Sequence, residues 1–221
     1  MSRKPLLIGL VIVALIALAV AGWYVFAGSA SESAIPDANQ KQTVTITAWD
    51  RTQGSPKAPI QIVEYAAPTC PHCAHFDMET FPLLKQKFID TGKVYYILRI
   101  FPLSPADVGA AAMARCLPED SYFQFLDLLW RNQAKWDPEF RVTDVHAGLV
   151  EMGRIAGMSA DKVDSCIGNQ AVSQKITEVG QDATTKFGVN SVPTFIVNGQ
   201  VRQFVGGWDE LQTYLNGLLK K

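Results

Sequence analysis

The sequence has little cysteine, little histidine and almost no net charge. Its 221 residues include 4 cysteines and 3 histidines, and 20 basic side chains against 21 acidic ones leave a formal net charge of −1. A protein that binds nucleic acid usually carries a basic stripe or patch. No block of like charge occurs along this chain, so we expect no nucleic-acid partner.

One long uncharged run is present, at the N-terminus. It follows Arg3 and Lys4, and residues 6–26 are apolar and long enough, at about 1.5 Å per residue, to cross a hydrocarbon core of about 30 Å. The two basic residues would remain in the cytoplasm. We predict that residues 1–30 form a signal anchor, with a cleaved signal peptide as the alternative. In both cases the rest of the chain is exported, and the membrane contact is through residues 6–26 if the segment is uncleaved.

The chain after this segment is long enough for one domain. Residues 31–42 are rich in Ser, Ala, Asn and Gln, which is typical of a tether. About 190 residues lie outside the predicted membrane segment, enough to bury a substantial core.

The most informative motif is Cys70-Pro71-His72-Cys73, which follows an apolar run and begins a helical pattern. A sulfur at the start of a helix lies among free backbone N–H groups, which favour a thiolate. The thiolate is the form that attacks disulfides and leaves from them, so the placement predicts a redox-active pair. A zinc site would need a second close cysteine pair, and a c-type haem would need His in place of Ala74.

The other two cysteines, Cys116 and Cys166, are fifty residues apart. In an oxidising compartment, bonds from Cys70 to Cys73 and from Cys116 to Cys166 would leave no cysteine unpaired. We expect the second bond to be structural. The alternative is a pair of buried free thiols, since free cysteine is among the most buried residue types.

The first half of the domain has the pattern of a β–α–β unit. Strands are predicted at residues 44–47, 60–66 and 94–100, with a loop over residues 52–56. Helical periodicity covers residues 70–89, with a kink expected at Pro82. Strand, helix and strand within about forty residues imply that the second and third strands are parallel.

Helices dominate the middle of the chain, and β pattern returns near its end. Helices are predicted at residues 106–116, 122–130, 145–155, 159–167 and 171–187. The last part combines a hairpin with a helix. Its strands are predicted at residues 193–197 and 201–205 around an Asn198-Gly199 turn, and its helix at residues 208–219.

This order, with C-P-H-C at the first helix and Val192-Pro193-Thr194 opening the hairpin, resembles the thioredoxin fold, and the helical insertion makes it similar to the DsbA family of exported thiol–disulfide oxidoreductases. The resemblance implies an α/β fold whose thioredoxin-like halves, residues 43–103 and 187–221, flank an inserted helical domain, residues 104–186. It implies no cofactor, and we expect a monomer.

The resemblance also assigns roles to single residues. It makes Cys70 the exposed attacking sulfur and Cys73 the buried resolving sulfur. Pro193 falls on the family's cis-proline beside the active site, with Val192 before it. Glu64 falls on the position of the family's buried acid, and we expect it to accept a proton from Cys73; the alternative is an ordinary edge charge.

Three further expectations concern the motif and the other histidines. The His72 ring or imidazolium is expected to stabilise the Cys70 thiolate, with a solvated helix-start residue as the alternative. Pro71 and Val192 are expected to contact the client protein. His75 and His146 are treated as structural or surface residues.

The resulting hypothesis is an enzyme that donates its disulfide to reduced exported client proteins, in the bacterial periplasm or on the extracytoplasmic face. A membrane-embedded partner resembling DsbB would reoxidise it. An isomerase is one alternative, although residues 31–42 are too few for the dimerisation domain of family isomerases. A reductase is another, and a metal-binding protein using Cys70 and Cys73 with His72 or His75 is a third.

Overall fold

The computed structural model describes residues 42–220. The predicted anchor and nearly all of the predicted tether lie outside these residues. Within the described part of the chain, no helix is both long and apolar enough to cross a membrane. The described residues all belong to one compact unit.

A mixed five-stranded sheet lies at the centre, in the order β1-β3-β2-β4-β5. The central pair, β2 (Ile60–Ala66) and β3 (Val94–Ile100), is parallel, as the β–α–β pattern predicted. The edge strand β1 (Arg51–Gln53) runs antiparallel to β3. On the other side, β4 (Thr194–Val197) runs antiparallel to both β2 and β5 (Gln200–Arg202).

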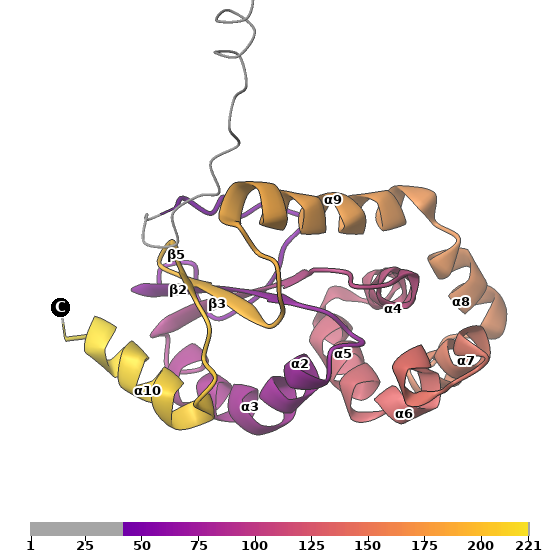
Figure 1. Cartoon of the computed structure of the whole chain (residues 1–221), viewed down its shortest axis with the longest axis horizontal. Coiled ribbons are helices and arrows are strands. Elements are labelled where there is room, and N and C mark those ends of the chain that lie inside the picture. The colour runs from indigo at the N-terminus through magenta and orange to yellow at the C-terminus, as the bar shows by residue number, and fades with distance from the viewer. Residues whose placement is uncertain (1–41, 221) are drawn as a thin grey trace, which may run out of the picture. The chain divides into compact units, whose positions relative to one another are not determined.

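Helices cover both faces of the sheet (Figure 1). On one face, α9 (Gln170–Phe187) packs against a buried cluster that includes Val63 and Ile97. The other face carries the helix that follows β2, together with α10 (Gly207–Leu218). Strand β2 is therefore buried on both faces, which explains its nearly continuous apolar sequence.

The helix after β2 spans the predicted range but alternates between α-helical and π-helical segments. It begins as α2 (Pro71–His75) and continues as α3 (Phe81–Leu84), and π-helical turns at Phe76–Thr80 and Lys85–Ile89 follow each of these segments. Pro82 has no N–H to donate to the preceding turn, which accounts for an irregular helix at this point.

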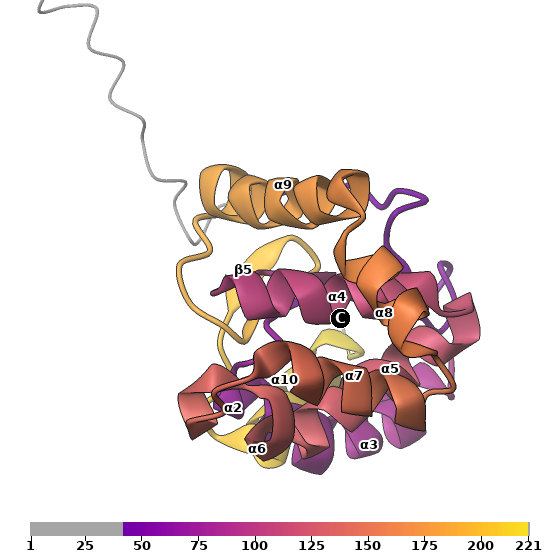
Figure 2. The same ribbon diagram turned by 90° about the vertical axis from the view of Figure 1, so that its right-hand side faces the viewer.

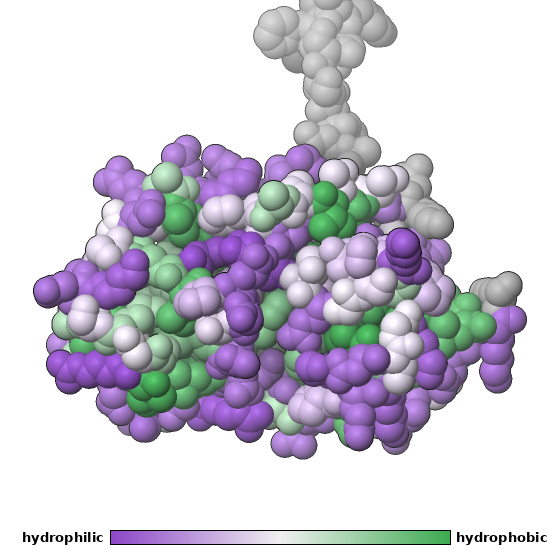
Figure 3. All heavy atoms as spheres, turned by 180° about the vertical axis from the view of Figure 1, so that it is seen from behind, coloured by the Kyte–Doolittle hydropathy of each residue, from purple (hydrophilic) through white to green (hydrophobic). Residues whose placement is uncertain are grey.

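The inserted block contains the five predicted helices and the short α6, which the sequence pattern missed. Besides α9, described above, it contains α4 (Pro105–Cys116), α5 (Tyr122–Arg131), α6 (Gln133–Trp136), α7 (Val145–Ile155) and α8 (Ala160–Ile167). Figure 2 shows α4 between α9 and the layer of α5, α6 and α7. Seen from behind, the surface alternates hydrophilic areas with separate apolar patches (Figure 3).

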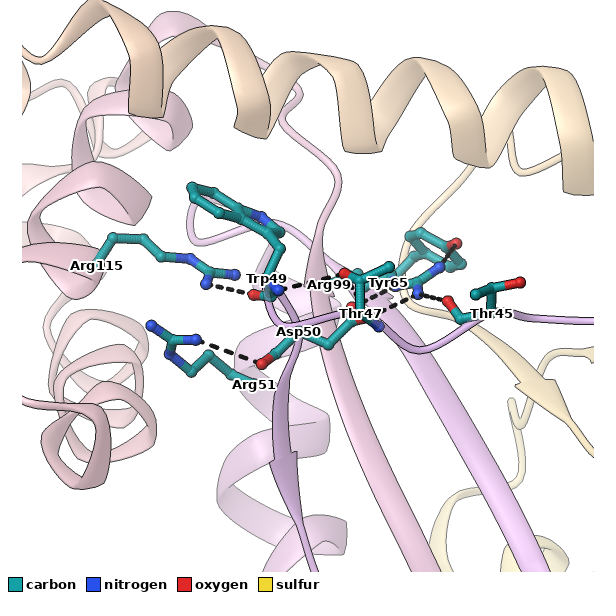
Figure 4. Close-up of polar contacts among 8 residues, drawn as sticks. All are labelled: Thr45, Thr47, Trp49, Asp50, Arg51, Tyr65, Arg99 and Arg115. Carbon is teal, nitrogen blue, oxygen red and sulfur yellow. Dashed lines mark hydrogen bonds and ion pairs between the residues drawn. The ribbon is translucent and has the colours of Figure 1, made fainter. Parts of the chain in front are cut away.

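The prediction of a first strand at residues 44–47 is wrong. The loop predicted over residues 52–56 is wrong at residues 52–53, which belong to β1, and agrees with the structure at residues 54–56. Near residues 45–47 the backbone is held by side-chain hydrogen bonds and by a turn between Thr47 and Asp50 instead of a strand ladder. The Asp50 carboxylate accepts from the Thr47 N–H at 2.7 Å, and Arg99 Nη2 donates to the Thr45 carbonyl at 2.7 Å (Figure 4).

Arg99 is the centre of this polar cluster, which joins the segment before β1 to the sheet (Figure 4). Its guanidinium donates to both Asp50 carboxylate oxygens, at 2.7 and 3.0 Å, and to the Tyr65 hydroxyl at 3.1 Å. The Asp50 side chain is only 2% exposed. Although burial acts to raise the pKa of Asp50, its hydrogen bonds from Arg99 and Thr47 bring that pKa below the usual value.

The hairpin and the final helix agree with the sequence pattern, with a shorter last strand. Asn198 and Gly199 both have positive φ, at 48° and 84°, as a tight two-residue hairpin turn requires. Strand β5 ends at Arg202, earlier than the predicted residue 205, and Val205 is 94% exposed.

Candidate active site

The C-P-H-C motif lies where strand β2 gives way to helix α2. Cys70 is the N-cap of α2, with Pro71 at the first helical position, where a missing N–H costs no hydrogen bond. The Cys73 backbone N–H donates to Cys70 Sγ at 3.3 Å. The sulfur of Cys70 thus takes the capping role that a side-chain oxygen usually fills.

The two cysteines have opposite environments. The pKa of Cys70 is lowered to about 7, first by a hydrogen bond from the Cys73 thiol and then by the backbone N–H groups of Cys73 and His72. Burial raises the pKa of Cys73 well above its usual value. The geometry therefore holds one readily ionised sulfur next to one that keeps its proton.

The expectation that Cys70 is exposed is wrong. Cys70 is 5% exposed and Cys73 is 1% exposed, whereas Pro71 and His72 are exposed. The loop before β4 covers Cys70, whose Sγ lies 3.6 Å from the Val192 carbonyl oxygen. The inward position predicted for Cys73 agrees with the structure.

The Val192–Pro193 peptide bond is cis. Both residues lie in the loop that opens β4, and this loop brings the Val192 carbonyl to Cys70 across 122 residues of sequence. Proline at this point removes no ladder bond, since the strand begins at Thr194.

Glu64 lies in the central strand β2 and is 1% exposed, so it is no edge charge. Its Oε2 accepts a hydrogen bond from the Tyr96 hydroxyl at 2.6 Å. Burial raises the pKa of Glu64 to about 8, although the Tyr96 bond acts in the opposite direction. Its charge in turn contributes to the raised pKa of Cys73. Glu64 is thus a carboxyl group that can hold a proton near neutral pH beside the buried sulfur.

Sequence reasoning missed a second carboxyl group near this site. Asp77 follows Cys73 by four residues, and burial together with the neighbouring Asp127 raises its pKa to about 8. The charge of Asp77 also contributes to the raised pKa of Glu64. The four-residue spacing from Cys73 was the available signal, because such residues lie on one side of a helix.

The remaining predicted residues are the second cysteine pair and the histidines. Cys116, at the end of α4, and Cys166, in α8, form a disulfide with a Cα–Cα distance of 5.9 Å. His75 and His146 are exposed, and His146 Nε2 lies 2.6 Å from an Asp164 carboxylate oxygen. The backbone N–H of His72 bonds to the Cys70 sulfur and acts to lower its pKa. Stabilisation of the thiolate by the His72 ring stays a prediction.

Comparison with known proteins agrees with this geometry. The thioredoxin family matches residues 47–217. A Rickettsia typhi protein named as a protein-disulfide oxidoreductase is 32% identical over 163 residues, which cover 72% of this chain and 58% of that protein. A Bacillus cereus protein named disulfide bond formation protein D is 27% identical over 172 residues, covering 76% of this chain and 78% of that one.

The chain thus spans less than two thirds of the length of its Rickettsia relative. Among solved structures, Wolbachia pipientis α-DsbA1 superposes with a TM-score of 0.72 at 27% identity, over 79% of this chain and 93% of that one. The fold, the thiol pair at the start of α2 and these similarities agree. The chain belongs to the thioredoxin family and, within it, to the DsbA-like proteins.

Proposed function

We propose that this protein is a thiol–disulfide oxidoreductase that donates the Cys70–Cys73 disulfide to reduced, exported client proteins. The observation that carries the proposal is the contrast between the two sulfurs, with the pKa of Cys70 lowered to about 7 and that of Cys73 raised. Stabilising the reduced form of a thiol pair makes its disulfide a stronger oxidant.

In the first step a client thiolate attacks the Cys70 sulfur and breaks the Cys70–Cys73 bond. A mixed disulfide forms, and Cys73 leaves as a thiolate in a buried site that disfavours its charge. Glu64, with a pKa of about 8, can supply a proton to Cys73 at neutral pH. A second client thiolate then attacks the client sulfur of the mixed disulfide.

Cys70 leaves in that second step as a thiolate, and a leaving thiol of low pKa departs faster. The client has lost two electrons and gained a disulfide, and the protein retains the electrons as the Cys70–Cys73 dithiol. We propose that a membrane-embedded partner resembling DsbB accepts these two electrons, and that the domain works on the extracytoplasmic face, held there by residues 6–26.

Client contact is assigned to the surface around the sulfur. A client that reaches the buried Cys70 sulfur would pass Pro71, which is exposed, and Val192, whose carbonyl faces Cys70. The edge groups near cis-Pro193 would accept an extended client segment in the manner of an added strand.

The test is the equilibrium of the thiol pair with glutathione, together with oxidation of a reduced, unfolded protein that needs disulfides. We expect a potential well above that of thioredoxin and net disulfide formation in the client. A potential near or below about −270 mV would favour a reductase. Rearrangement of wrongly paired disulfides without net oxidation would favour an isomerase.

The metal-binding alternative has a separate test. Among residues 42–220, no group of three His, Cys, Asp or Glu side chains lies close enough together to hold a metal ion. Metal analysis of protein purified under reducing conditions should find less than one equivalent bound. A stoichiometric metal released by thiol alkylation would contradict the redox proposal.

A further inference from the structure

The three residues before Cys70 are held by three different helices of the inserted block. The Trp130 indole N–H donates to the Ala67 carbonyl at 3.0 Å, and Gln133 Nε2 donates to the Pro68 carbonyl at 2.9 Å. The Asp107 carboxylate accepts from the Thr69 backbone N–H at 2.7 Å. These three side chains, from α5, α6 and α4, are called the loop clamp below.

Each bond of the loop clamp is buried and connects residues far apart in the sequence. Asp107 is fully buried, and Trp130 and Gln133 are 4% and 6% exposed. The bonds cross 38 to 65 residues of chain. A buried hydrogen-bonding group that loses its partner is costly, so the loop is fixed at three successive residues.

Asp107 joins this loop to the beginning of α4. Besides Thr69, which also donates through its hydroxyl at 3.0 Å, the carboxylate accepts from the N–H groups of Leu103 and Ser104, both at 2.9 Å. The Ser104 hydroxyl completes a capping box with it. The N-terminus of α4 and Thr69, the residue before Cys70, therefore share the Asp107 carboxylate as acceptor. The spacing Ser104-x-x-Asp107, typical of a capping box, was the signal for this carboxylate in the sequence.

The loop that the clamp holds also contacts the backbone of Cys70 and the thiol of Cys73. The Cys70 N–H donates to the Ala67 carbonyl at 3.1 Å, the same oxygen that Trp130 binds. On its other side the Ala67 backbone N–H bonds to Cys73 and acts to lower the pKa of Cys73 against the effect of burial. A shift of Ala67 would therefore move the Cys70 backbone and change the hydrogen bond that the Cys73 sulfur accepts.

We propose that Asp107, Trp130 and Gln133 are positioning residues through which the helical block sets the redox equilibrium of the Cys70–Cys73 pair. This deepens the proposed function and rests on it. Loss of one clamp bond would let the 67–69 loop move, which would shift the Cys70 backbone and weaken the Ala67 N–H contact to the Cys73 sulfur. The reduced form would then be less stable, and the disulfide would be a weaker oxidant.

The experiment compares Gln133→Met with Asn132→Leu in the full chain. Gln133→Met keeps the side-chain length and removes the donor to Pro68. Asn132 is the matched control, since its amide donates to the Leu128 carbonyl at 2.8 Å within the helical block and makes no bond to the loop. The pH dependence of thiolate absorbance reports Cys70 ionisation, and glutathione mixtures report the redox equilibrium. Denaturant unfolding reports stability.

We expect Gln133→Met to raise the Cys70 pKa and to shift the glutathione equilibrium by about fivefold towards the retained disulfide, the effect of one hydrogen bond. Asn132→Leu should change the glutathione equilibrium by less than about twofold, which is the smallest effect expected for one hydrogen bond. It should leave the Cys70 pKa where it is in the original protein. Trp130→Phe, which removes only the donor to Ala67 among the clamp bonds, should act in the same direction as Gln133→Met.

Equal effects of Gln133→Met and Asn132→Leu on the redox equilibrium would overturn the proposal, even if both variants are less stable. If Gln133→Met does not fold, Trp130→Phe decides by the same readouts. The proposed function fails separately, when the unaltered protein does not oxidise a reduced client. The Cys70 pKa and the glutathione equilibrium can be measured in either case.

Discussion

The backbone N–H of Cys73 points to the sulfur of Cys70 at 3.3 Å. This one relationship makes Cys70 the N-cap of the helix that begins at the thiol pair and places Cys73 beside it. A thiolate at a helix N-terminus also benefits from the positive end of the helix dipole. The backbone geometry of C-x-x-C at a helix start is thus itself a source of the low Cys70 pKa.

Replacing Cys73 should make Cys70 harder to ionise. The Cys73 thiol is the largest contributor to the lowered Cys70 pKa. We expect the rate of Cys70 alkylation to rise with pH around a midpoint near 7 in the reduced protein, and Cys73→Ala to move that midpoint upward. An unchanged midpoint would mean that the backbone N–H groups suffice. Cys70→Ala is the control that isolates Cys73, which should react only at high pH.

Cys73→Ser should trap client proteins as mixed disulfides through Cys70, and Cys70→Ser should abolish disulfide exchange. Without Cys73, a complex with a client has no internal thiol to release it, so covalent complexes should accumulate on non-reducing gels. Trapping by Cys70→Ser but not by Cys73→Ser would reverse the roles of the two sulfurs.

Glu64→Gln should change how the stability of the reduced protein depends on pH. The folded-state pKa of Glu64 is about 8, above its ordinary value of 4.5. The folded state therefore keeps a proton that the unfolded state has lost. This contribution to the free energy of unfolding is complete below about pH 4.5 and is lost as the pH rises towards 8.

Unfolding with denaturant at several pH values measures this dependence. We expect Glu64→Gln to remove part of the loss of stability between pH 5 and pH 8. Glu79→Gln, which removes an exposed carboxylate from the helix that follows β2, is the control for the loss of one carboxyl group. Parallel profiles for the original protein and Glu64→Gln would contradict the raised pKa.

Removing the Cys116–Cys166 disulfide should lower stability without changing exchange. The bond closes a loop across a sequence separation of 50 residues. Replacing both cysteines with alanine is expected to cost about 2–4 kcal/mol in the free energy of unfolding, because the unfolded chain gains freedom. The glutathione equilibrium of Cys70 and Cys73 should be retained. A large change in that equilibrium would show that the second disulfide also acts on the active site.

Breaking the ion pair between Arg99 and Asp50 should lower the free energy of unfolding. Asp50 is 2% exposed at its side chain, and Arg99 gives it two hydrogen bonds. Arg99→Met leaves a buried carboxylate without its cation, and we expect a loss of about 3–5 kcal/mol. Arg99→Met combined with Asp50→Asn should lose less than the sum of the two single changes, as a double-mutant cycle in denaturant would measure. Additive losses would mean that the two groups do not interact.

Much of the fold could be predicted because its signals are local. Strands Ile60–Ala66 and Val94–Ile100 and helix Val145–Ile155 begin and end where the pattern placed them. Each element buries one or two faces, and its residues record that burial with the period of a strand or a helix. The Asn198-Gly199 turn was predictable for a related reason, since few residues adopt positive φ at low cost.

The wrong predictions involve contacts between distant parts of the chain. Strand Arg51–Gln53 has only three residues, too few for a periodic signal, and it forms because β3 offers a free edge. The segment at residues 44–47 alternates like a strand, but Asp50 and Arg99 take up its backbone groups. Cys70 is buried because of a loop that begins more than a hundred residues later.

A local pattern was enough to predict that a thiol pair begins a helix after a buried strand, because C-x-x-C and the apolar run before it are contiguous. The surroundings of those thiols depend on how the whole chain folds. Val192 lies over Cys70, and Asp107 holds the residue before it. Glu64 is buried with Tyr96 as its partner. Local periodicity reports which face of an element is buried, but the partner across that face depends on how the chain folds back. Burial and these partners together determine each pKa.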